Sequence, residues 1–112
     1  MAFIHTRELP WQSTPVKGVT VKELVHQPHG TAKLIRLAPG AEYPTHQHPD
    51  RDEYVYVLSG TLTASVFGEP YEALPGDFTL VPKGTPHALA NYTDQDVTTW
   101  VGAIMPGGSE TR

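Results

Sequence analysis

The sequence predicts an all-β domain of antiparallel strands, folded as a sandwich or barrel with little or no helix. Segments rich in β-branched residues, some of them alternating apolar with polar positions, recur with turn residues about every eight to twelve positions. The 112 residues include 10 glycines and 11 prolines, which suit tight turns better than helices. Roughly nine strands are expected, and closing them into a barrel would remove exposed strand edges.

Length and charge narrow the class of protein. A chain of 112 residues can close one modest hydrophobic core, so we expect a single domain. The formal net charge is -4 and the basic residues are scattered, which argues against a nucleic-acid partner. No apolar run approaches the roughly 20 residues of a membrane-spanning helix, and the N-terminus lacks a signal-peptide pattern. We therefore expect a cytoplasmic protein with no membrane partner.

The chain divides into three parts. Residues 1–15 contain two prolines and show no periodicity, so they are expected to form an N-terminal arm anchored by Trp11. Residues 16–106 are expected to form the barrel. Residues 107–112 are polar and glycine-rich, and we expect a flexible tail there.

The strands are predicted from local patterns. Residues 19–25 alternate apolar and polar side chains, as a half-buried strand does. Residues 31–38 end before a Pro-Gly pair, because proline cannot donate to a strand ladder. Residues 53–58 and 61–67 are expected to form a hairpin, since only two residues separate them. The other expected strands are residues 71–74, 78–81, 87–92 and 96–105.

Four residues are candidate metal ligands. His46 and His48 flank Gln47, so an extended backbone would direct both imidazoles to one side. Glu53 follows a break in the pattern that can bring its carboxylate to the same face, and His87 is the fourth candidate. The chain has no cysteine, so any metal must be held by imidazole and carboxylate groups. The alternative is a solvated polar turn around the first two histidines and a surface position for His87.

Such a ligand set suits one divalent transition metal. Three imidazoles and one carboxylate leave positions for water or substrate on a five- or six-coordinate ion. The residue types do not distinguish among Fe, Mn, Zn, Ni, Co and Cu.

Two stretches resemble the paired signatures of the cupin superfamily. Residues 40–60 match the first signature at every specified position, which are Gly40, His46, His48, Glu53 and Gly60. Residues 76–91 match the second signature at Gly76, Pro82, Gly84, His87 and Asn91. The short spacer between them is similar to that of small single-domain bacterial cupins.

This resemblance implies a fold and a site. The fold would be an antiparallel jelly-roll β-barrel with the ligands directed into its interior. The metal set would be His46, His48, Glu53 and His87, while Asn91 would be a structural position only. The apolar residues that could line the cavity are Tyr43, Val55, Val57, Phe78, Leu80, Leu89 and Trp100.

The resemblance leaves three functions open. The first is a metal-dependent dioxygenase, or related oxidoreductase, acting on a small diketone-like or phenolic carbonyl substrate, with Glu53 as a ligand or a base. The second is a non-catalytic metal or small-ligand sensor, because the chain also resembles the cupin-like zinc domain of anti-sigma factors. The third is a sugar isomerase or epimerase, which would need cationic residues in the pocket. Arg36 and Arg51 are the nearest arginines, and exposed salt bridges are expected for both.

The strand that starts at Glu53 predicts a homodimer. Its period of two places Val55 and Val57 beside the carboxylate and directs Tyr54, Tyr56 and Leu58 to the opposite face. That outer face is apolar, and a second subunit would cover it, as similar small cupins commonly do. The alternative is that the N-terminal arm covers it within one chain.

Overall fold

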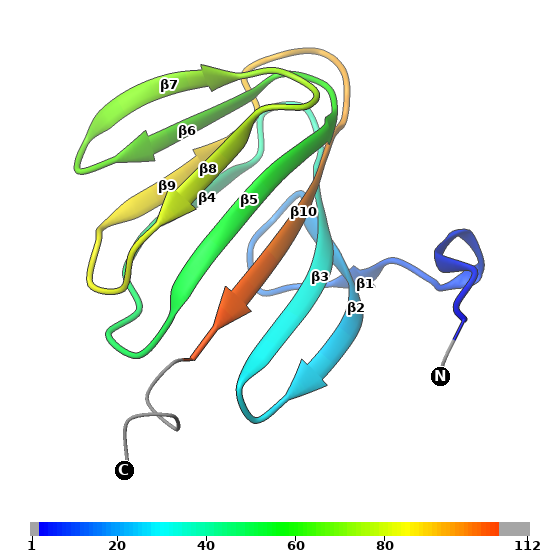
Figure 1. The fold of residues 1–112 in the computed structure, drawn as a ribbon. Helices are drawn as coiled ribbons and strands as arrows, with labels where there is room; N and C mark the ends of the chain where they lie inside the picture. Colours follow the sequence, from blue (N-terminus) through cyan, green and yellow to red (C-terminus); the bar gives the residue numbers. More distant parts are fainter. Residues whose placement is uncertain (1–2, 106–112) are drawn as a thin grey trace, which may run out of the picture.

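The fold consists of two antiparallel sheets facing each other. The computed structural model describes residues 3–105. One sheet has the strand order β1-β2-β3-β10-β5-β8, and the other has the order β4-β9-β6-β7 (Figure 1). The strands are β1 (Gln12–Ser13), β2 (Val19–Gln27), β3 (Gly30–Leu37), β4 (Glu42–His46), β5 (Asp52–Ser59), β6 (Leu62–Val66), β7 (Glu69–Ala73), β8 (Phe78–Val81), β9 (His87–Ala90) and β10 (Val97–Ile104).

The prediction of an all-β jelly-roll barrel is confirmed. Within residues 3–105 the one helical element is a 3₁₀ turn, Thr6–Glu8. No helix in this part of the chain is long and apolar enough to cross a membrane. The predicted tail, residues 107–112, lies outside the described residues, and the predicted domain boundaries stay a prediction.

The inner faces of the two sheets form the core. On β5, Val55 and Val57 are buried, with 2% and 1% of their surfaces exposed, whereas Tyr56 and Leu58 are 40% and 44% exposed. The predicted alternation of this strand is therefore confirmed. Its inward side chains join Leu37 of the same sheet and Leu62 and Leu89 of the opposite sheet in one apolar cluster. Since β5 carries Glu53 in the same phase, the core strand also aims the carboxylate inward.

The N-terminal arm covers the outer face of the six-stranded sheet over β2 and β3, away from β5 and β8. Residues 12 and 13 add the short strand β1 to β2, a pairing that the sequence pattern did not predict. The Trp11 ring lies 4.7 Å from Lys22 Nζ and 4.4 Å from Arg36 Cζ. Arg36 thus makes a cation–π contact where a salt bridge was expected. Trp11 lies over β2 and β3, so Tyr56 and Leu58 on β5 stay exposed.

Asn91 holds the end of the second signature in place. Its side chain is fully buried and donates hydrogen bonds to the carbonyl oxygens of Leu37 (3.0 Å) and Gln95 (2.7 Å). Its own oxygen accepts hydrogen bonds from the backbone N–H and the hydroxyl of Thr93. A buried amide with all these partners stabilises a loop, as expected for a structural position.

Candidate metal centre

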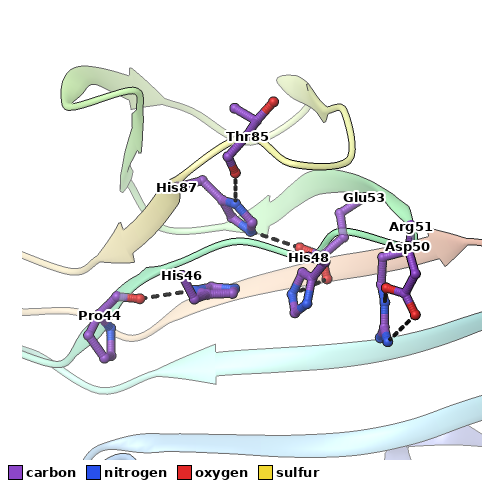
Figure 2. A network of polar contacts seen from close by, with 8 residues as sticks. All are labelled: Pro44, His46, His48, Asp50, Arg51, Glu53, Thr85 and His87. Atoms are coloured by element: carbon purple, nitrogen blue, oxygen red, sulfur yellow. Dashed lines mark hydrogen bonds and ion pairs between the residues drawn. The ribbon is translucent and has the colours of Figure 1, made fainter.

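The four candidate ligands meet at one open end of the barrel. His46 is the last residue of β4 and His87 the first of β9, and the two are paired across these strands. His48 lies in the loop after β4, and Glu53 near the start of β5 in the other sheet. The site is therefore assembled from both sheets, and Figure 2 shows the three rings and the carboxylate converging.

Short contacts join the four side chains. His87 Nε2 lies 2.9 Å from Glu53 Oε1, and His48 Nε2 lies 3.5 Å from Glu53 Oε2. The ring centroids of His46 and His87 are 4.2 Å apart. His87 is buried, with 4% of its surface exposed, and the other three are half-buried. The structure thus brings the four predicted ligands together in one cluster.

Backbone carbonyls orient two of the imidazoles. His46 Nδ1 is 2.9 Å from Pro44 O, and His87 Nδ1 is 2.8 Å from Thr85 O (Figure 2). A carbonyl oxygen only accepts, so each Nδ1 carries the proton and donates it. Nε2 is then the ring nitrogen that points to the other ligands. This is the usual outer-shell arrangement for a metal-binding histidine.

Protonation of the site is uneven. Burial lowers the pKa of His48 below 6.5, in spite of the attraction of Glu53. Burial acts to lower the pKa of His87 as well, but the hydrogen bonds to Glu53 and to Thr85 O prevail and raise it above 6.5. Burial acts to raise the pKa of Glu53, yet its contacts with His87 and His48 lower it overall. Without a metal, the contact between the two groups thus favours the ionised carboxylate of Glu53 and the protonated form of His87.

The donor set fits a divalent transition metal. One donor atom from each of the four residues lies within 4.8 Å of the others, so the cluster could hold one ion. Donors bound to one ion at about 2.1 Å lie at most about 4.2 Å apart, so the donor atoms would move closer together when they bind an ion. Nitrogen and carboxylate donors suit several such ions, and the metal is therefore not identified by them.

A pocket opens beside the cluster. Its cavity volume is about 70 Å³, and it is open to solvent on one side. Tyr43, Val55 and Leu89 line it, as the sequence analysis had suggested. The further lining residues are Lys33, Ile35, His46, His48, Arg51, Glu53, His87 and Val101.

Four of the suggested lining residues do not belong to this pocket. Phe78 and Leu80 are 58% and 53% exposed on the outer face of β8, because their phase is opposite to that of the core residue Val81. Val57 is buried in the core beyond the pocket. Trp100 also points outward, and its ring packs over Gly102, where a Cβ atom would clash with it.

Three further lining residues, Lys33, Ile35 and Val101, were not expected from the sequence, and Lys33 is the charged one among them. It lies on β3 in phase with Ile35 and Leu37, which are 4% and 0% exposed. Period-two counting back from these two apolar positions would have placed Lys33 on the inner face. The expectation for Arg51 is confirmed, since its Nε lies 3.0 Å from Asp50 Oδ1 in an exposed ion pair. Arg51 nevertheless also lines the pocket.

A family comparison agrees with the fold. A family model described as a cupin domain matches residues 33–102, which is more than half of the chain and includes all four candidate ligands. The chain belongs to the cupin superfamily. The resemblance inferred from the two signatures is thereby confirmed.

Curated relatives of this cupin have different activities. Quercetin 2,3-dioxygenase from Bacillus subtilis is 41% identical over 55 residues, which cover 49% of this chain and 16% of the relative. Dimethylsulfoniopropionate lyase DddQ from Ruegeria pomeroyi is 37% identical over 62 residues, which cover 54% of this chain and 30% of the lyase. The cupin thus matches well under half the length of either relative.

The fold also matches a solved structure of similar length along nearly the whole of both chains. KdgF from Halomonas superposes with a TM-score of 0.83 at 25% sequence identity, covering 93% of this chain and 94% of that one. The comparisons therefore establish the family and the fold, but not one reaction.

Proposed function

We propose that His46, His48, Glu53 and His87 hold one divalent transition metal and that the chain is a metal-dependent dioxygenase or related oxidoreductase. The substrate would be a small organic molecule with a diketone-like or phenolic carbonyl group. The observation that carries this proposal is the pocket, in which the polar cluster lies beside a wall formed in part by the apolar side chains Ile35, Val55 and Leu89. Such a wall suits an organic ring or chain whose polar end faces the cluster.

One of the relatives supports an oxidative reaction. The matched segment of 55 residues is 41% identical to a protein named as a 2,3-dioxygenase. When bound, a redox-active ion would supply a Lewis acid for carbonyl oxygens and a partner for electron transfer with dioxygen. The protein's part would be to hold the substrate against the cluster and to exclude bulk water.

Glu53 is the candidate base. Its pKa is lowered overall, so the carboxylate is ionised at neutral pH and can accept a proton from an enol or phenol. One of its oxygens bonds to His87 and the other is 3.5 Å from His48 Nε2. The same group is therefore placed to serve either as a ligand or as a base.

Oxygen uptake tests the proposal. Iron-loaded protein should consume about one O₂ per pentane-2,4-dione or 2-hydroxyacetophenone converted, because both oxygen atoms enter the products and no reductant is needed. An oxygen electrode measures the uptake, and product analysis gives the ratio. The His48→Ala variant, treated identically, serves as the control. Stoichiometric zinc in the purified protein, with no uptake after iron loading, would point to the sensor alternative.

One observation favours the isomerase or epimerase alternative. That function requires cationic residues in the pocket, and Lys33 and Arg51 both line it. Incubating the metal-loaded protein with sugar phosphates under anaerobic conditions separates the two functions. Isomerisation there, with no oxygen uptake on any carbonyl substrate, would replace the dioxygenase proposal.

We further propose that a second copy of the chain covers the outer face of β5 and β8. Four large apolar side chains are exposed there by 40–58%, and β8 is an edge strand whose backbone can pair with another copy. These side chains are Tyr56, Leu58, Phe78 and Leu80. The Tyr54 and Phe78 rings stack at 5.9 Å, which gives this face a flat and rigid part.

Substitution on this face should produce monomers. Phe78→Asp would place a charge in the interface of a two-fold dimer twice, once from each copy. Light scattering coupled to size exclusion should then show a dimer for the unmodified protein and a monomer for the variant. Phe67→Asp is the matched control, because that aromatic is 70% exposed in the β6–β7 turn, away from the patch. A monomeric unmodified protein at micromolar concentration would refute the dimer.

A further inference from the structure

Lys33 is a cation that lines the pocket beside the His-Glu cluster, next to apolar side chains of the core. On β3 its side chain shares the inner face with Ile35 and Leu37, while Arg36 lies on the outer face against Trp11. Lys33 is half-buried and is one of the lining residues of the pocket. Its position is set by the strand, so its direction does not depend on a loop conformation.

The sheet register places Lys33 opposite the metal-centre side of the pocket. Lys33 pairs with Val101 on β10, and Val101 pairs with Val55 on β5. Glu53 stands one inward position before Val55 on the same strand. Neighbouring strands are about 4.8 Å apart, so the backbones of Lys33 and β5 are separated by roughly 10 Å. A small molecule can therefore reach the lysine and the cluster at the same time.

The charge of Lys33 has no partner within the pocket. Among residues 3–105, no carboxylate lies within ion-pair distance of its Nζ. Glu53 is engaged by His87 and His48, and Arg51 by Asp50. Glu23 faces Lys33 across β2 and β3 but makes no ion pair with it. Lys33 lies in the pocket with Ile35, Val55 and Val101, so an anion that binds there could pair with its charge.

We propose that Lys33 binds an anionic group of the substrate, with a carboxylate as the best match, while the substrate's carbonyl end lies at the His-Glu cluster. The pocket would then be selective for an organic anion over a neutral molecule of similar shape. This inference rests on the proposed function for the use of the pocket as a substrate site. It does not depend on the reaction being an oxygenation.

Binding of two matched probes tests the inference. Pentane-2,4-dione is neutral, and 2,4-dioxopentanoate carries the same dicarbonyl with a carboxylate in place of one methyl group. Titration calorimetry on metal-loaded protein without oxygen should show the carboxylate binding about 10- to 100-fold more tightly, as a hydrogen bond to a charged group provides. Lys33→Gln should reduce this preference to below about threefold, and Lys33→Arg should retain most of it.

The controls separate recognition from structure and from chemistry. Lys17→Gln removes the same charge from an exposed residue outside this pocket and should leave the preference unchanged. The metal content and melting temperature of Lys33→Gln should equal those of the unmodified protein. A preference that persists in Lys33→Gln overturns the inference, since the carboxylate would then be bound by the metal or another residue. Equal binding of both probes, or no binding of either, overturns it as well.

The binding experiment on Lys33 and the oxygen-uptake assay can fail independently of each other. Carboxylate preference without oxygen uptake would retain Lys33 as the anion-binding residue and reject the dioxygenase. Uptake without the preference would retain the dioxygenase and reject the role of Lys33.

Discussion

His48→Ala should lower the metal affinity by more than the roughly 10- to 100-fold that loss of an outer-shell partner costs. The substitution removes one of four donors, and it also removes the contact of His48 Nε2 with Glu53 Oε2 at 3.5 Å. His48 lies in a loop and is half-buried, so its loss leaves no large cavity and the barrel should still fold. Elemental analysis of dialysed protein, with circular dichroism to verify the fold, measures the effect.

The matched control is His26→Ala. His26 is an exposed histidine on β2 and does not belong to the cluster, so this variant should keep the full metal content. If His48→Ala retained one ion per chain at unchanged affinity, the four-ligand assignment would be wrong.

Acidification from about pH 7.5 to about pH 5.5 should release the metal, because the interval crosses the ordinary histidine pKa of about 6.5. Since the pKa of His87 is raised, protons compete with the metal at this residue from above pH 6.5. At His48, whose pKa is lowered, they compete only below 6.5. Each imidazole that must lose a proton changes the apparent affinity by up to about tenfold per pH unit. A chelating dye follows the release.

The metal-free protein should show the opposite trend above pH 6.5. A raised folded-state pKa means that the proton on His87 stabilises the fold at and below 6.5, and this stabilisation is lost as the pH rises through the raised value. The melting temperature should therefore fall over that interval without metal and rise with it. His87→Gln should flatten the metal-free trend. Stoichiometric metal retained below about pH 5 would contradict this account of the site.

Much of the fold and the cluster could be predicted from the sequence. The strand β8 was predicted with its observed ends, and β5 with its observed phase, because Val and Tyr alternate there without interruption. The cluster could be predicted because the spacing of His46, His48 and Glu53 is fixed within one short stretch. His87 was added through the second signature, and the structure pairs it with His46 across two strands.

The pocket wall was harder to predict, because it depends on which face of each strand is turned inward. Phe78 and Leu80 are apolar residues at alternate positions of one strand, yet they face outward. No local pattern distinguishes an outer apolar face from an inner one. Lys33 was overlooked because a lysine in a strand is ordinarily solvated. The strand β1 was missed because a two-residue pairing depends on the contact of Trp11 with β2 and β3 rather than on its own sequence.

The hydrogen bond between His87 and Glu53 joins β9 of one sheet to β5 of the other at the open end of the barrel. The two sheets therefore cannot separate at this end without dismantling the ligand set. A bulky ligand that pushed the two sheets apart at this end would also move the proposed metal ligands apart. The same contact would therefore limit both the size of a ligand and how firmly an ion could be held.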